Sequence, residues 1–199
     1  MEIPLWSCYR RRERNGLAAV LLAGVALVIL RWEEFPIGAG MDDAYYIEMA
    51  RSLAEGRGPV IHLGGIVPGW NPGVFPLGFS LLLSPLAWLE PGAVGVFRLV
   101  PILALAALFP LCHRLAHLGM SSRGLALAAL VCLNPWTIGH ATRVLSDLPF
   151  AALSLAAVLL YLHLADDPSV RWRPLLVLVV ITVASIMVRS IGLALPLAM

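Results

Sequence analysis

The sequence contains no lysine, few charged residues and few cysteines, and each shortage excludes a class of protein. All 14 basic residues are arginine, and charged residues make up only 13% of the 199 positions. These arginines form no basic face of the kind that binds nucleic acid, so no nucleic-acid partner is expected. Cys8, Cys112 and Cys132 lack metal-ligand spacing, and the last two lie in or beside apolar runs, so a disulfide framework is not expected.

Hydrophobic residues are abundant instead. They make up 60% of the chain, and the mean hydropathy is +0.86, which is more apolar than a soluble domain of this size. A membrane-spanning helix needs about 20 residues. The sequence therefore predicts an all-α, polytopic transmembrane protein with about five spanning helices, at residues 16–30, 93–112, 124–139, 148–165 and 174–189.

The arginines predict the orientation of these helices. Arg10, Arg11, Arg12 and Arg14 precede the first span, which places the N-terminus in the cytoplasm under the positive-inside rule. A cleaved signal peptide is the alternative, but no small-residue cleavage site follows, so an uncleaved anchor in the cytoplasmic membrane is favoured. Residues 31–92 and 140–147 are then the two external segments, and the first contains most of the acidic residues.

The apolar run at residues 75–89 is too short to be counted as a span. It has about 15 residues and contains Pro76 and Pro85, so an interfacial or re-entrant helix is predicted. If it does not span, the arginine-containing loops at 114–123 and 171–173 both fall in the cytoplasm, in agreement with the positive-inside rule.

Asp42 and Asp43 are the first candidate functional residues. Tyr46, Met49 and Ala50 follow at helical spacing, and Gly56 can end this helix in a left-handed conformation. The helix should be amphipathic and lie along the membrane surface. One interpretation is that either aspartate caps the helix. The other is that one carboxylate acts as a general base in a cavity while its neighbour caps the helix or holds a metal ion.

Asp147 lies between two apolar runs, where a charged group is costly unless it is paired or faces water. It could cap the helix that contains Pro149, and Arg143 could neutralise it. In the predicted topology Asp147 emerges on the same face as Asp42, so the two carboxylates should share one cavity. Arg98 and Arg189 fall near the outer ends of spans, where arginine either snorkels to the interface or binds phosphate.

Several histidine and aromatic residues also fall in or beside the segments that are predicted to be external. His62 and His140 could bind a metal ion with a carboxylate, but no paired spacing supports such a site. Tyr45 and Tyr46 could line a sugar site or belong to an interfacial aromatic belt. The belt is the expected role of three tryptophans, Trp70, Trp88 and Trp136.

The order of these features resembles the N-terminal part of the GT-C superfamily of multi-spanning glycosyltransferases. The resemblance is to the branch of protein O-mannosyltransferases, aminoarabinose transferases and related sugar transferases. It rests on an N-terminal anchor followed by DDAYYIEMARSLAEGRG, NPGVFPLGFSLLLSPLAWL, FRLV, SDLPF and VRSIG, and it covers nearly all of residues 10–195.

The resemblance implies a sugar transfer at the outer face of the cytoplasmic membrane. The donor would be a polyprenyl-phosphate-linked sugar, and the acceptor a lipid, a glycan or a protein. Asp42 matches the leading acid of the first external loop, with Asp43 beside it, and Asp147 matches the acid of the next loop. Arg189 matches a basic residue near the lipid phosphate, and Arg98, Arg143 and Tyr46 are further candidates for binding substrate. Some relatives use a divalent metal ion, and no ligand set for one can be identified.

Two other classes of function remain open at this point. A lipid or solute transport component would use the same acidic residues as a polar pathway, and a non-catalytic membrane subunit would not use them chemically. The chain ends in the apolar stretch IGLALPLAM, and members of the superfamily are several hundred residues long. We therefore expect residues 1–199 to be the N-terminal part of a longer transferase domain.

Overall fold

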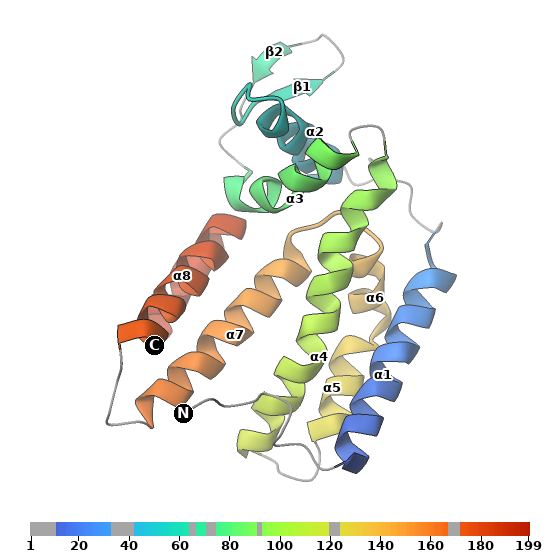
Figure 1. Cartoon of the computed structure of the whole chain (residues 1–199), viewed down its shortest axis with the longest axis vertical. Helices are drawn as coiled ribbons and strands as arrows, with labels where there is room; N and C mark the ends of the chain where they lie inside the picture. The colour runs from blue at the N-terminus through green and yellow to red at the C-terminus, as the bar shows by residue number, and fades with distance from the viewer. Residues whose placement is uncertain are drawn as a thin grey trace.

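Long apolar helices that alternate in direction form the body of the computed structural model. The structure describes residues 11–32, 42–63, 67–70, 75–90, 93–119, 124–166 and 172–199. Helix α1 (Arg11–Leu30), the pair α5 (Gly124–Cys132) and α6 (Pro135–Ala141), and α8 (Trp172–Val188) run towards one end. Helices α4 (Leu99–Gly119) and α7 (Asp147–Ala165) run the opposite way (Figure 1). This alternation brings residues 42, 147 and 189 to the same end of the bundle.

A small cap lies at that end (Figure 1). It contains α2 (Asp42–Ala54), the strands β1 (Ile61–Leu63) and β2 (Val67–Trp70), and α3 (Leu77–Leu89). The two strands pair in an antiparallel hairpin, and the 3-10 helix η1 (Val94–Arg98) connects the cap to α4. The all-α prediction is therefore confirmed for the body of the fold, and the hairpin is an addition that was not predicted.

Two apolar clusters hold these parts together. The first joins α1, α4, α5, α6 and α7 around residues such as Leu17, Phe109 and Ile138. Cys112 and Cys132 are buried in this cluster as free thiols, as the sequence indicated. The second cluster fastens the cap to the bundle through Tyr46, Phe79, Leu83, Phe97, Val144 and Val188. Burying large apolar side chains from both sides fixes α2 and α3 against the ends of α7 and α8.

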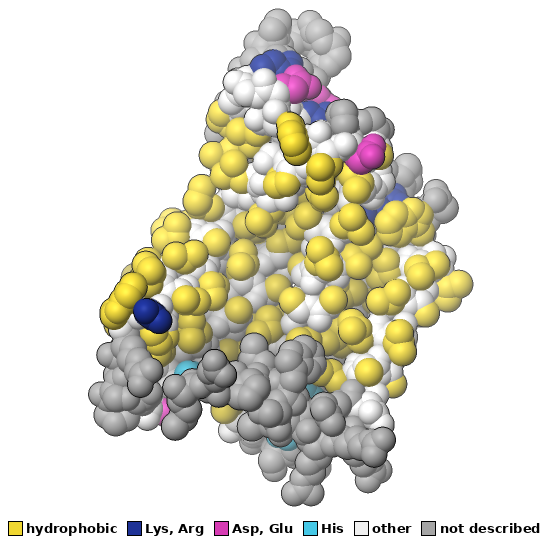
Figure 2. All heavy atoms as spheres, viewed as in Figure 1, with side chains coloured by type: hydrophobic (Ala, Val, Ile, Leu, Met, Phe, Trp, Pro, Cys, Tyr) yellow, Lys and Arg dark blue, Asp and Glu magenta, His cyan; other side chains and the backbone are white. Residues whose placement is uncertain are grey.

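Within the described residues, two helices are long and apolar enough to cross a membrane, Val94–Leu118 and Asp147–Ala165, and a third span results if α5 and α6 count as one. Figure 2 shows hydrophobic side chains over much of one face of the bundle, where few charged side chains are visible, and a group of charged side chains at the cap. An apolar surface of this width is typical of a membrane protein.

The predicted span at residues 124–139 is wrong as a single helix. It is broken into α5 and α6, whose axes differ by 59°. The Asn134 side chain accepts a hydrogen bond of 2.8 Å from the backbone N–H of Trp136, and Pro135 takes the first helical position. Asparagine as the cap and proline at the first position both favour a new helix start, so the chain begins a second helix here.

Two predictions about the cap agree with the structure. The helix predicted after Asp42 is α2, with Tyr46, Met49 and Ala50 buried, and Gly56 has the left-handed conformation expected after its end (φ 74°). The run at 75–89 forms α3, whose 13 residues extend only about 20 Å, less than the thickness of the hydrocarbon core.

Candidate functional site

A cavity of about 610 Å³ lies where α2, the start of α3, the start of α7 and the end of α8 meet. Its wall includes two carboxylates, one guanidinium and one phenol, together with apolar side chains. The lining residues are Asp42, Tyr46, Phe75, Pro76, Asp147, Phe150, Arg189, Ser190 and Ile191. The shared cavity that was predicted for Asp42 and Asp147 is therefore present, and Tyr46 and Arg189 lie in its wall as well.

Asp147 and Arg189 form an ion pair on this wall, between Oδ1 of Asp147 and Nη1 of Arg189. The side chains remain 39% and 40% exposed, respectively, so a ligand in the cavity can reach both. The prediction that Arg143 neutralises Asp147 is wrong, because Arg189 takes that position. The prediction that Asp147 caps its helix is also wrong, since Ser146 occupies the cap position and Asp147 is the first helical residue.

The turn after α8 positions Arg189. The chain leaves the helix in an extended conformation at Arg189 (φ −147°, ψ 130°) and then forms η2 (Ser190–Leu193). At Gly192 the backbone passes so close to α8 that an added Cβ would lie 2.9 Å from backbone atoms of Ser185 and Ile186. This tight reversal turns Arg189 out of the helical row and towards the start of α7.

The two adjacent aspartates differ in their surroundings. Both belong to the first turn of α2, so neither is the residue that precedes the helix, as the capping hypothesis required. Asp42 is exposed and lines the cavity, whereas Asp43 is 4% exposed and accepts a hydrogen bond of 3.0 Å from the backbone N–H of Ala44. Asp42 is therefore the carboxylate that a substrate in the cavity can reach.

Tyr46 connects the cap to the start of α7. Its hydroxyl lies 3.4 Å from Oγ of Ser146, and its ring packs edge-on against Phe75 and Phe79. Burial is the largest effect on the pKa of Tyr46 and raises it above the ordinary value, although the contact with Ser146 lowers it. The phenol therefore stays protonated near neutral pH and can donate a hydrogen bond.

Arg98 is not part of this site, and both roles predicted for it are wrong. Its side chain is buried, at 5% exposed. Nη1 donates a hydrogen bond of 2.6 Å to the backbone carbonyl of Trp32, and the guanidinium lies 4.8 Å from the centre of the Trp32 ring. Arg98 fastens η1 to the chain that leaves α1, which is a structural role.

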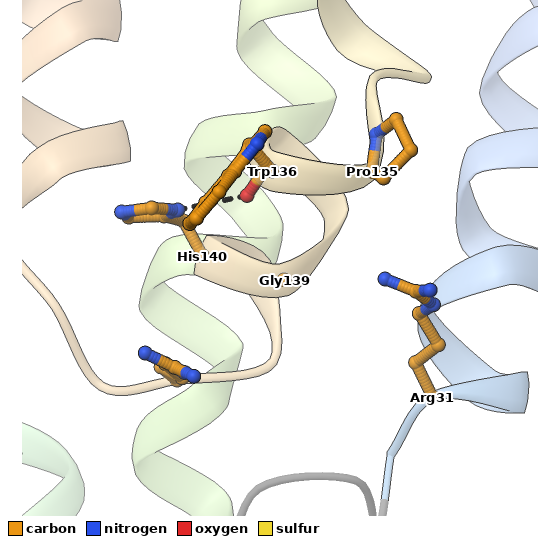
Figure 3. Close-up of a pocket in the computed structure, with 6 residues that line it drawn as sticks. Arg31, Pro135, Trp136, Gly139 and His140 are labelled. Carbon is orange, nitrogen blue, oxygen red and sulfur yellow. Dashed lines mark hydrogen bonds between the residues drawn. The ribbon is translucent and has the colours of Figure 1, made fainter. Parts of the chain in front are cut away.

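Arg143 and His140 line a different, smaller cavity of about 200 Å³, between the end of α1 and α6. Figure 3 shows Arg31 extending from α1 towards the helix that carries Pro135, Trp136 and Gly139. Nδ1 of His140 lies 2.7 Å from the carbonyl oxygen of Trp136, one helical turn earlier. The structure thus separates Arg143 from the cavity that contains Asp42.

The predicted metal ligands do not form a cluster within the described residues. No group of three or more His, Cys, Asp or Glu side chains is placed there to hold a metal ion. The side chain of His62 lies outside the described part of the chain, so the hypothesis of a site at His62 stays a prediction.

Comparison with protein-family models, with curated proteins and with solved structures gave no match. The assignment of a function therefore rests on the chemistry of the cavity and on its position at the end of apolar helices.

Proposed function

We propose that this chain is part of a glycosyltransferase that moves a sugar from a polyprenyl-phosphate donor to an acceptor at the outer face of the cytoplasmic membrane. The observation that carries the proposal is the joint presence of Asp42, Asp147 and Arg189 in one cavity. Their positions extend over most of the sequence, so the fold rather than local sequence brings them together. A carboxylate and a guanidinium around a half-apolar cavity suit a substrate that is both anionic and lipid-linked.

Each residue has a role in this proposal. The Asp42 carboxylate takes the proton of the acceptor hydroxyl as the acceptor oxygen attacks the anomeric carbon of the sugar. The bond between that carbon and the phosphate oxygen breaks, and polyprenyl phosphate leaves with the bonding electrons. Arg189 stabilises the charge on the phosphate through its fork of donors. Asp147 holds Arg189 in position, as their ion pair supports.

The apolar part of the cavity suits the lipid end of the donor. Phe75, Phe150 and Ile191 line the cavity, and Leu81, Leu82 and Trp88 expose apolar side chains along α3. A short helix with such a surface can lie at the interface, next to the first isoprene units. Under this proposal the cap faces the outer leaflet.

The proposal includes five membrane crossings, by α1, α4, the α5–α6 pair, α7 and α8. The alternation of their directions supports this topology (Figure 1). Helix α8 has 17 residues and extends about 26 Å, slightly less than the hydrocarbon core, which a bilayer can accommodate by thinning locally.

A transport component is the second candidate function, and the break between α5 and α6 favours it. Interrupted helices often form substrate sites in secondary transporters. Proteoliposomes separate the two candidates, because a transporter moves the lipid-linked sugar across the bilayer with its glycosidic bond intact. A non-catalytic subunit would neither transfer nor move it.

The test is a transfer assay on the purified protein with polyprenyl-phosphate-linked hexoses and pentoses. Asp42→Asn keeps the shape of the side chain and removes the base, so transfer should fall at least ~100-fold. The matched control is Glu48→Gln, which removes a carboxylate from the same helix. Glu48 pairs with Arg51 at 2.8 Å and does not line the cavity, so transfer should not change. Equal transfer by wild type and Asp42→Asn would reject Asp42 as the base.

A further inference from the structure

A third cavity, of about 240 Å³, lies in the cap at the C-terminal ends of α2 and α3, which pack side by side (Figure 1). Its described lining consists of Arg51, Ala54, Glu55, Ala87 and Trp88. The two alanines have small side chains, which leaves space between the helices. A guanidinium and a carboxylate from α2 thus lie beside an indole from α3. The described linings of this cavity and of the proposed transfer site share no residue.

We propose that this cavity binds the headgroup of phosphatidylethanolamine, with the phosphate on Arg51 and the ammonium on Glu55. The two residues are one helical turn apart, so their Cβ atoms are separated by about 5–6 Å. In the headgroup only an ethylene bridge separates the phosphate from the ammonium, so one side of α2 can reach both. The headgroup carries one charge of each sign, as this pair of side chains does. Such a site does not require the transferase function.

The ion pairs of Arg51 and Glu55 are compatible with a bound headgroup. Nη1 of Arg51 lies 2.8 Å from Oε1 of Glu48. A guanidinium has five N–H donors, so one pair leaves others for a phosphate. Oε2 of Glu55 pairs with Arg57, and a carboxylate accepts at both of its oxygens. The side chain of Glu55 is 55% exposed and that of Arg51 is 25% exposed, so a headgroup can reach both.

The Trp88 indole favours an ammonium group and a membrane lipid. Trp88 is 73% exposed, and the face of an indole attracts a cation. Leu89, the next residue, is 64% exposed. These apolar side chains at the end of α3 offer a surface for acyl chains, and tryptophan is enriched at the level of lipid headgroups. Free phosphoethanolamine has no acyl chain to place on this surface.

The experiment compares binding of short-chain phosphatidylethanolamine and phosphatidylcholine to the purified protein in detergent, by native mass spectrometry. Both lipids carry the phosphate, but only the ethanolamine headgroup has N–H donors for Glu55. Wild type should therefore bind phosphatidylethanolamine about fivefold more tightly, the effect of about one net hydrogen bond. Glu55→Ala removes the acceptor and should abolish this preference. Glu55→Gln keeps an uncharged acceptor and should show an intermediate preference.

The phosphate contact is tested separately. Arg51→Gln should weaken binding of both lipids about fivefold and leave their ratio unchanged, because both present a phosphate to the guanidinium. Asp166→Asn and Arg173→Gln are the matched controls. Asp166 follows the end of α7 and Arg173 lies at the start of α8, at the end of the bundle opposite the cap. Both variants should leave both affinities within about twofold, since exposed charges act over only about 10 Å.

The ratio of the two affinities decides the outcome, because a variant that folds poorly would lose both lipids together. Equal binding of the two lipids by wild type would overturn the proposal, and so would a preference that survives Glu55→Ala. Free phosphoethanolamine should not compete at millimolar concentration. Full competition by it would assign the cavity to a soluble ligand and overturn the lipid assignment.

Discussion

The cavity of Asp42 and the cavity between α1 and α6 differ in their lining, because Asp42 and Asp147 line the larger one, whereas the described lining of the smaller one is basic and aromatic. In the larger one, Arg189 is paired with Asp147 and lies near Asp42. In the smaller one, the described side chains beside Arg31 and Arg143 are those of Trp136 and His140. An arginine that is held by a carboxylate has a fixed direction and a nearly neutral pair charge, which suits chemistry on a polar substrate.

We expect the largest loss of sugar transfer from changes to the Asp147–Arg189 pair. Asp147→Asn removes the group that orients Arg189, and a misplaced catalytic group can cost about 10²-fold in transfer rate. Arg189→Gln should reduce transfer to a similar extent. Because the two residues act as a unit, the double variant should be no worse than the poorer single variant. Steady-state transfer assays of the three variants measure this, and additive losses would show that the two residues act separately.

The next largest effect is a loss of stability at the contact that holds α3 against α8. A Cβ added at Gly78 would lie 2.5 Å from the carbonyl carbon of Met187. Gly78→Ala should therefore force the helices apart and destabilise the fold by about 1–3 kcal/mol, as overpacking does. Thermal unfolding in detergent measures the loss. Gly95→Ala is the matched control, because an added Cβ at Gly95 meets nothing within 4 Å, and its stability should be near that of wild type.

Arg98 differs from Arg189, because its partners are a backbone carbonyl and an aromatic ring. Arg98→Lys should lose most of the planar contact with Trp32 and cost about 1 kcal/mol of stability. Sugar transfer by this variant should remain at the wild-type level, because Arg98 is not among the residues that line the larger cavity. A large loss of transfer without a loss of stability would place Arg98 in the functional site after all.

The smallest loss of stability is expected from Tyr46→Phe. This change keeps the ring contacts with Phe75 and Phe79 and removes only the 3.4 Å contact with Ser146. The bond is long, so the free energy of unfolding should fall by about 0.5 kcal/mol, the low end of the range for a hydrogen bond. Chemical denaturation compares this variant with Tyr45→Phe, whose ring also contacts Phe75. A loss of several kcal/mol would show that the hydroxyl holds the cap in place.

The helix directions and the end at which the acidic residues meet could be predicted from the sequence, because both follow from apolar length and arginine placement. The partner of Asp147 could not, because Arg189 lies 42 residues away and only the turn at Gly192 directs it to α7. The burial of Arg98 was missed for the same reason, since its partner Trp32 lies 66 positions away.

Two other features had a local signal that was not used. Asn134-Pro135 combines a helix cap with a residue suited to the first helical position, and it marks the break between α5 and α6. Gly64-Gly65 lies between the β-branched residues Ile61 and Val67 and is a typical hairpin signal. The difference between Asp42 and Asp43 had no such signal, because adjacent residues on a helix face different directions and the packing decides which is buried.

The most direct test of the central claim is a cross-link across the larger cavity. Asp42→Cys/Ile191→Cys, with Cys8, Cys112 and Cys132 replaced by alanine, should react with a bifunctional thiol reagent that extends about 10–15 Å, the width of a substrate-sized pocket. Glu55→Cys/Ile191→Cys uses the other end of α2 and should not cross-link. A polyprenyl-phosphate sugar should slow the first reaction by occupying the cavity. Equal cross-linking of both pairs, or no effect of the donor lipid, would contradict the proposal that this cavity is the transfer site.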